Sequence, residues 1–329
     1  MTTLHWGLLG TARINRAVIP AIRQARRSAL DVVASRDLAR AQAYASEWQI
    51  PRAAGSYEAL LADTSVNAIY VPLPNHLHVE WTIAAARAGK HVLCEKPIAL
   101  VPSDVERLQR AASDAGVVIA EGFMYRHHSQ TRRVQALVDG GTLGEIRLIH
   151  GSFSFMLDRD SDVRLQSALG GGSLWDVGCY PVSYARLLMR SEPESVVGFA
   201  ELGPTGVDLT FAGMLRFSGG RLATFDCGFR SAFRASMEIV GTDAALEIPS
   251  PFKPGAHEQL SVVRDGVRTT IPLDMDDGAL YLGEIEDMER AALDGAPQAI
   301  PLTDSRGNVA AIQALYASAA DGRPVALRR

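Results

Sequence analysis

The stretch Trp6-Gly-Leu-Leu-Gly10-Thr-Ala12-Arg-Ile-Asn15 predicts a strand, a glycine turn and the start of a helix. A dinucleotide-binding turn of this kind places glycines at the positions of Gly10, Ala12 and Asn15. Only Gly10 keeps the glycine, although Ala12 still lets the backbone come fairly close to a pyrophosphate. Taken alone, the stretch therefore fits either a nucleotide turn or a generic strand-to-helix turn.

The residues that follow repeat the alternation of strand and helix. Apolar runs at 6–10, 31–35, 68–72, 91–94 and 117–120 alternate with segments of helical period, which is the pattern of a parallel sheet. The first helix contains Pro20, which should kink or tighten it. A later helix spans 75–88, and another opens with a capping box at Ser103–Glu106. These features predict an N-terminal Rossmann domain over residues 1–122.

Beyond residue 122 the pattern changes. Between Ile146 and Ile271 the strand-like stretches are longer, and turn sequences at 218–220, 241–243 and 265–266 separate them. Helical segments at 283–293 and 308–319 close the chain. We therefore predict an α/β protein in which the parallel-sheet domain is followed, at 123–329, by an α+β domain with an open and mainly antiparallel sheet.

Composition excludes several classes of function. The chain has 329 residues, enough for two domains, and its formal charge of -4 provides no basic field for nucleic acid or an anionic membrane. The three cysteines, Cys94, Cys179 and Cys227, are far apart, which argues against a disulfide framework or a zinc cage. We find no export signal or membrane segment. These features predict a cytoplasmic protein with no metal and a small-molecule partner.

The end of the second strand predicts the cofactor. An NAD enzyme normally places a carboxylate there for the ribose hydroxyls, but this chain reads Ala34-Ser35-Arg36-Asp37. A serine followed by an arginine suits a 2′-phosphate, and Arg40 could add a second positive contact. NADP(H) is therefore favoured. NAD(H) stays a possible cofactor, because Asp37 could bind a ribose. Arg36, Asp37 and Arg40 could also be no more than the solvent-exposed start of a helix.

Two later motifs carry candidate chemistry. Cys94-Glu95-Lys96-Pro97 ends the fourth strand at the sheet edge where Rossmann ligands bind, and its lysine can donate to a substrate oxygen. The glycine-rich run 170–173 precedes Asp176 and Tyr180. At a spacing of four residues on a helix start, these two side chains face the same way.

These motifs, together with Gly122-Phe-Met-Tyr125-Arg126, resemble the Gfo/Idh/MocA family of glucose–fructose oxidoreductase and inositol 2-dehydrogenase. The resemblance covers essentially the whole chain. Many members carry histidine where this chain has Tyr180, and the tyrosine form resembles the branch of dihydrodiol dehydrogenase, NADP-dependent D-xylose dehydrogenase and sugar 3-ketoreductases. The resemblance implies an NADP(H)-dependent dehydrogenase or reductase acting on CH–OH groups of a polyhydroxylated substrate, working as a homodimer or a dimer of dimers.

The resemblance also implies that Lys96 and Tyr180 form the catalytic pair and that Asp176 orients a substrate hydroxyl. The chemistry agrees, because a carbonyl oxygen that gains charge during hydride transfer needs a proton donor. A free phenol titrates near ~10, and a neighbouring ammonium would bring that value closer to neutrality. Each of the three residues also has an ordinary structural alternative: an exposed lysine, a helix cap and a core aromatic.

We expect the cofactor to contact the turns at the strand ends and a few basic side chains beyond them. The expected contacts are Gly10, Thr11, Ala12, Arg13, Ile14, Ser35, Arg36, Arg40, Pro72, Leu73, Asn75, His78, Glu95, Lys96, Arg126 and Arg164.

Two other functions stay open. One is an NAD-assisted glycosidase, in which transient oxidation of the sugar permits elimination; such enzymes typically carry histidine near the position of Tyr180. The other is a non-catalytic dinucleotide-binding sensor, which would more naturally have lost Lys96 or Tyr180.

Overall fold

The structure is a computed structural model and describes residues 2–159, 161–255, 259–273 and 280–327. The chain divides into two compact units, one from Met1–His128 with Asp277–Arg306 and the other from Ser129–Asp276 with Gly307–Arg329. The predicted division at residue 122 treats the domains as contiguous. The units differ from it because helix α8 (Leu282–Asp294) packs against α1 (Asn15–Gln24) and so belongs to the first unit.

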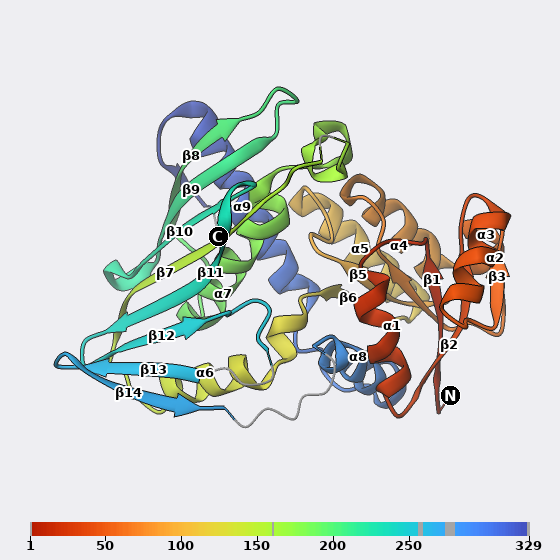
Figure 1. Ribbon diagram of the computed structural model, residues 1–329, viewed down its shortest axis with the longest axis horizontal. Helices are drawn as coiled ribbons and strands as arrows, with labels where there is room; N and C mark the ends of the chain where they lie inside the picture. Colours follow the sequence, from red (N-terminus) through yellow and green to blue (C-terminus); the bar gives the residue numbers. More distant parts are fainter. Residues whose placement is uncertain (1, 160, 256–258, 274–279, 328–329) are drawn as a thin grey trace. The chain divides into compact units, whose positions relative to one another are not determined.

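The first unit contains a six-stranded parallel sheet with the order β3-β2-β1-β4-β5-β6 (Figure 1). The predicted Rossmann-type sheet is therefore confirmed. The strand order reverses between β1 and β4, and ligands of such sheets bind at this switch point, outside the carboxyl ends of the strands. The strands are β1 (Leu4–Leu9), β2 (Ser28–Ala34), β3 (Arg52–Ala54), β4 (Ala68–Val71), β5 (His91–Glu95) and β6 (Ile119–Gly122).

The helices of this unit begin close to the predicted positions, with one correction. We expected a capping box at Ser103, but α5 (Pro102–Ala115) begins one residue earlier, and its N-cap, Val101, makes no side-chain cap. Proline suits the first helical position because its missing N–H needs no partner there. The other helices are α2 (Leu38–Glu47), α3 (Tyr57–Leu61), η1 (Asn75–Leu77), α4 (His78–Arg87) and η2 (Met124–His127).

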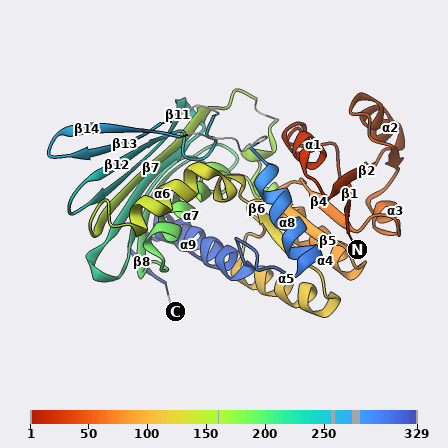
Figure 2. The same ribbon diagram turned by 90° about the horizontal axis from the view of Figure 1, so that it is seen from below.

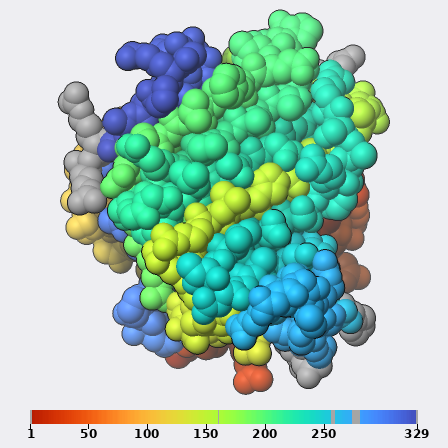
Figure 3. Space-filling model, turned by 90° about the vertical axis from the view of Figure 1, so that its left-hand side faces the viewer, coloured from red at the N-terminus to blue at the C-terminus, as the bar shows by residue number. Residues whose placement is uncertain are grey.

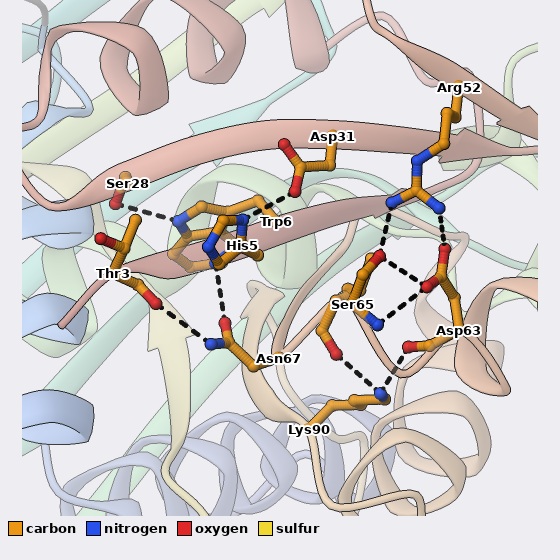
Figure 4. A network of polar contacts seen from close by, with 11 residues as sticks. Thr3, His5, Trp6, Ser28, Asp31, Arg52, Asp63, Ser65, Asn67 and Lys90 are labelled. Atoms are coloured by element: carbon orange, nitrogen blue, oxygen red, sulfur yellow. Dashed lines mark hydrogen bonds and ion pairs between the residues drawn. The ribbon is translucent and has the colours of Figure 1, made fainter. Parts of the chain in front are cut away.

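A network of polar contacts holds the amino ends of the strands (Figure 4). The backbone N–H of His5 donates to Asn67 at 2.7 Å, and the His5 ring lies 2.8 Å from Asp31. The ammonium of Lys90 donates to the backbone carbonyls of Asp63 and Val66, at 2.7 and 2.6 Å. These contacts lie at the opposite edge of the sheet from the carboxyl ends of the strands.

The second unit contains a nine-stranded sheet with the order β14-β13-β12-β11-β7-β10-β9-β8-β15. Among the strands that the structure describes, only the pair β7–β10 runs parallel, so the predicted open and mainly antiparallel sheet is confirmed. The predicted turns at 218–220, 241–243 and 265–266 all join neighbouring strands. The strands are β7 (Ile146–Met156), β8 (Ser195–Leu202), β9 (Asp208–Arg216), β10 (Leu222–Gly228), β11 (Arg230–Gly241), β12 (Ala245–Pro249), β13 (Gln259–Arg264), β14 (Val267–Pro272) and β15 (Val325–Ala326).

Helices cover one face of this sheet and leave the other open (Figures 2 and 3). Helix α7 (Cys179–Met189) packs against β7 and β10, and Leu315 of α9 (Leu302–Asp321) lies against Gly198 and Gly213. The remaining helices are α6 (Ser129–Asp139), η3 (Val163–Leu165), η4 (Ser167–Leu169), the π-helix η5 (Leu174–Gly178) and η6 (Ser218–Gly220). Among the described residues, no helix combines the length and the apolar character needed to cross a membrane.

Candidate active site

The turn after β1 has a backbone conformation at Gly10 that favours glycine. Gly10 has a φ of +119°, and a Cβ there would lie 3.3 Å from Leu73 in the loop after β4. The buried side chain of Asn15, at the place of the third glycine, donates to the Gly10 carbonyl at 2.9 Å. Asn15 thus fixes the turn that the third glycine usually shapes. Of the other predicted contacts in the turn, Thr11, Ala12 and Ile14 are half-buried and Arg13 is exposed.

The three charged residues that follow β2 make different contacts. Asp37 caps α2, because its carboxylate accepts the backbone N–H groups of Ala39 and Arg40 at 2.9 and 3.3 Å. The Arg40 side chain donates to the Thr11 hydroxyl at 2.8 Å. Arg36 is exposed and forms no hydrogen bond or ion pair with any residue that the structure describes. The free guanidinium is therefore available to an anion, while the nearest carboxylate is occupied.

His78 connects two loops at the carboxyl edge. It is 1% exposed, and its ring nitrogens lie 2.7 Å from the carbonyl oxygens of Pro97 and Leu73. Burial lowers the pKa of His78. The His78 ring thus bonds to the backbone of both loops, and its expected contact with the cofactor stays a prediction. Its predicted neighbours Leu73 and Asn75 are half-buried, whereas Pro72 is buried.

The turn that carries Lys96 is fixed on both sides. Glu95 ends β5 and accepts a hydrogen bond from the Tyr70 hydroxyl at 2.5 Å. Two residues after Lys96, the backbone N–H of Ile98 donates to Glu121 at 2.9 Å. These contacts position Lys96 at the sheet edge, as the motif predicted.

Glu284, in the first turn of α8, is a buried acid that the sequence did not point to. It is 1% exposed, and neither carboxyl oxygen has a hydrogen-bond partner among the described residues. A Cβ on Gly122 would lie 3.6 Å from Glu95 Oε1 and 3.7 Å from Glu284 Oε2, so both acids face the same spot. Burial and the charge of Glu95 raise the pKa of Glu284 well above its usual value. The surroundings of Glu284 therefore favour its protonated, uncharged form.

Arg126 has a fixed position inside the first unit. Its side chain is 8% exposed, and one guanidinium nitrogen lies 3.2 Å from Asp304 Oδ2. The neighbouring Tyr125 is fully buried. The structure therefore gives Arg126 an internal partner, and its contact with the cofactor stays a prediction.

In the second unit, the glycine-rich turn is shaped by close contacts. A Cβ on Gly171 would collide with the backbone carbonyl of Arg164. Gly172 has a φ of +126°, and a Cβ there would collide with Asp208 and lie 2.7 Å from the hydroxyl of Tyr316. These positions require glycine because neighbouring groups occupy the space of a side chain.

Asp208 is a second residue that sequence reasoning missed. This carboxylate begins β9, is 1% exposed and accepts three hydrogen bonds, from the Ser173 hydroxyl at 2.6 Å, the Leu174 N–H at 2.8 Å and the Tyr316 hydroxyl at 2.6 Å. Burial raises the pKa of Asp208. Because Leu174 begins the π-helix, Asp208 holds the start of the segment that carries Asp176.

Asp176 forms an ion pair with Arg164, a residue that we expected among the cofactor contacts. Arg164 Nε donates to Asp176 Oδ2 at 2.7 Å, and its Nη1 lies 3.2 Å from Asp162. The nearby carboxylates, Asp176 above all, raise the pKa of Arg164. We expected Arg164 to contact the cofactor; the structure shows that it orients Asp176, and the cofactor contact stays a prediction.

Tyr180 lies in the first turn of α7, among aromatic rings. It is 4% exposed, and its ring centroid lies 5.5 Å from those of Phe153 and Phe252. We expected Asp176 and Tyr180 on one regular helix start, but Asp176 lies in the π-helix that precedes α7. This correction matters because π-turns are frequent at functional sites. Lys96 and Tyr180 belong to different units, so their pairing stays a prediction.

Comparisons with known proteins agree in both halves of the chain. Residues 4–123 match the model of an oxidoreductase family with an NAD-binding Rossmann fold, and residues 131–247 match the GFO/IDH/MocA C-terminal domain. The chain is 39% identical to a D-xylose 1-dehydrogenase (NADP(+)) of Haloferax volcanii, over 98% of this chain and 100% of the relative. It is 31% identical to a trans-1,2-dihydrobenzene-1,2-diol dehydrogenase of Xenopus laevis, over 91% and 93%.

A solved structure is similar as well. A 3-ketoreductase from Actinomadura kijaniata, in complex with NADP and TDP-benzene, superimposes with a TM-score of 0.91 at 30% identity, covering 96% of this chain and 98% of that one.

Proposed function

The chain belongs to the Gfo/Idh/MocA oxidoreductase family, and from that premise we propose that it transfers a hydride between NADP(H) and a CH–OH or C=O group of a sugar, inositol or diol. The observation that carries this proposal is the match of both halves of the chain to enzymes of this kind, with Lys96 and Tyr180 present. The similar xylose dehydrogenase uses NADP⁺ by its name, and the similar ketoreductase was solved with NADP bound. Both support NADP(H) as the cofactor.

The residues of the first unit fit NADP(H). The positive φ of Gly10 leaves the turn open to a pyrophosphate. At the end of β2, the exposed guanidinium of Arg36 would hold the 2′-phosphate, since Asp37 is occupied as a helix cap. Arg36→Ala should therefore weaken NADPH binding at least tenfold and NADH binding far less, as measured by fluorescence titration. Equal losses for both cofactors would remove Arg36 from the role.

We assign the proton step to Tyr180. When bound, NADP(H) supplies or accepts the hydride at the substrate carbon. In reduction, the Tyr180 hydroxyl gives its proton to the carbonyl oxygen, and in oxidation the phenolate takes the proton back. The Lys96 ammonium would stabilise the phenolate and donate to the same oxygen. Arg164 holds Asp176 at 2.7 Å, so this carboxylate can accept a hydrogen bond from a neighbouring substrate hydroxyl.

A direct experiment tests the proposal. Purified protein is titrated with NADPH and NADH, and sugars, inositols and diols are then screened for turnover with the preferred cofactor. Turnover of a polyhydroxylated compound with NADP(H) supports the assignment. Tight cofactor binding without turnover would favour the NAD-assisted glycosidase or the sensor, and no cofactor binding would refute the proposal.

We also propose that the protein is a cytoplasmic homodimer formed through the open face of the nine-stranded sheet (Figure 3). Gly198 and Gly213 face α9. Because successive residues of a strand alternate between the two faces of a sheet, the residues next to these glycines point to the open face. They include Phe199, which is 70% exposed, and Met214, which is 39% exposed. The buried, free thiols Cys94, Cys179 and Cys227 fit a reducing compartment. Sedimentation equilibrium measures the assembly, with a dimer of dimers as the alternative.

A further inference from the structure

Phe233, on β11, is an aromatic residue whose exposure the fold does not explain. Its side chain is 70% exposed, although the chain buries most of its other phenylalanines. A single exposed apolar side chain is ordinary and carries no argument alone. What distinguishes Phe233 is the backbone that presents it and the rings that it touches.

The backbone around Phe233 leaves the regular sheet. Arg230 of β11 pairs with Met156 of β7 and Arg234 pairs with Ser154, so three residues of β11 face only one of β7. Such bulges re-aim side chains and are frequent next to active sites. The irregularity therefore places Phe233 where regular pairing would not put it.

The ring of Phe233 reaches the proposed proton donor through one intermediate. Its centroid lies 6.4 Å from that of Phe153, in an edge-to-face arrangement. Phe153 is buried and in turn lies 5.5 Å from Tyr180. Tyr180, Phe153 and Phe233 thus form a continuous row from the buried tyrosine to the exposed phenylalanine, all within the second unit.

We infer that Phe233 is a specificity-determining residue that stacks against the ring of the substrate. The inference rests on the proposed function and names the substrate class more narrowly, as a ring that carries adjacent hydroxyl groups. Such a molecule offers an apolar ring face to Phe233, while its hydroxyls bond to Tyr180 and Asp176. Sites for small molecules commonly combine an aromatic wall with a few placed polar groups.

The arrangement discriminates by shape. An open-chain polyol has the same hydroxyl groups but no flat apolar face, so it gains little from Phe233. A ring gains contact area that is lost when the phenyl group is removed. We therefore expect the loss to appear in the binding of ring substrates and to leave the proton step unchanged.

The test compares Phe233→Ala with Val267→Ala, a control because Val267 is similarly exposed, at 67%, on β14 of the same sheet. D-xylose is the ring probe and xylitol the open-chain probe. Phe233→Ala should raise the KM for D-xylose about tenfold, with kcat and NADPH affinity nearly unchanged. The KM for xylitol should change less than twofold, and Val267→Ala should change neither KM. Phe233→Leu, which keeps apolar volume without a flat ring, should lie between Ala and the unaltered protein.

Calorimetric titration of D-xylose into the complex with NADP⁺ keeps the inference testable if no turnover occurs. Weaker binding to Phe233→Ala would support Phe233 as a substrate contact even though the proposed redox function had failed. Equal D-xylose affinity in the two alanine variants would overturn the inference. An equal loss for D-xylose and xylitol would also overturn it, because the effect would not depend on a ring.

Discussion

Replacing Glu284 with glutamine should stabilise the protein, and by an amount that grows with pH. Burial and the charge of Glu95 raise the pKa of Glu284 well above the ordinary 4.5. The folded state therefore keeps a proton that the unfolded state loses as the pH rises through this value. A raised acid pKa makes the folded state progressively less stable above that pH, until the folded carboxyl itself ionises.

The size of the effect follows from the number of pH units between 4.5 and the pH of the measurement. Each pH unit above 4.5 costs about 1.4 kcal/mol of unfolding free energy while the buried carboxyl stays protonated. At pH 7 the cost is at most roughly 3 kcal/mol, because it stops growing once the folded carboxyl itself ionises. Glutamine has nearly the same shape and no proton to keep, so it removes the cost. Glu284→Gln should thus gain up to roughly 3 kcal/mol at pH 7 and almost nothing near pH 4.5.

Unfolding by urea, followed by circular dichroism across this pH range, measures the difference. Glu286→Gln, the same change at a half-buried position two residues along α8, is the control and should leave the pH dependence as it is in the unaltered protein. A gain that is the same at every pH, or a loss of stability at pH 7, would refute a raised pKa of Glu284 in the folded state.

Two further predictions concern the start of the π-helix. Asp208→Asn puts an amide among three donors and should cost roughly 2–3 kcal/mol of unfolding free energy, whereas Tyr316→Phe removes a single donor and should cost about 1 kcal/mol; equal losses in urea unfolding would contradict the carboxylate's role. Gly172→Ala should cost at least 2 kcal/mol and lower turnover severalfold, because a Cβ collides with Asp208 and the φ of +126° is strained for alanine; unchanged kinetics would show that the turn can rearrange.

The sequence predicted the layers of the fold because their signals are local. Buried parallel strands are continuous apolar runs, and those at 68–72 and 91–94 match β4 and β5 closely. β3 was missed because its three residues, Arg52–Ala54, form no such run. We did not predict that α8 belongs to the first unit, because this depends on its packing against α1. An amphipathic sequence pattern shows that a helix buries one face but not which surface it packs against.

In the candidate site, too, residues in local motifs could be predicted and residues defined by distant contacts could not. Lys96, Asp176 and Tyr180 stand in short motifs, so the sequence could single them out. Asp208 and Glu284 could not be found in this way, because their roles arise from contacts with residues far along the chain. A glycine-rich turn does signal crowding, and for Gly172 the group that crowds it is Asp208.

The most direct test of the account is the turnover of Tyr180→Phe compared with that of Tyr184→Phe, which makes the same change one helical turn further along α7. Using the substrate found in the screen, the account predicts that Tyr180→Phe lowers kcat at least a hundredfold and leaves NADPH affinity unchanged, while Tyr184→Phe keeps most of the activity. Undiminished turnover by Tyr180→Phe, or an equal loss in both variants, would contradict the assignment of Tyr180 as the proton donor.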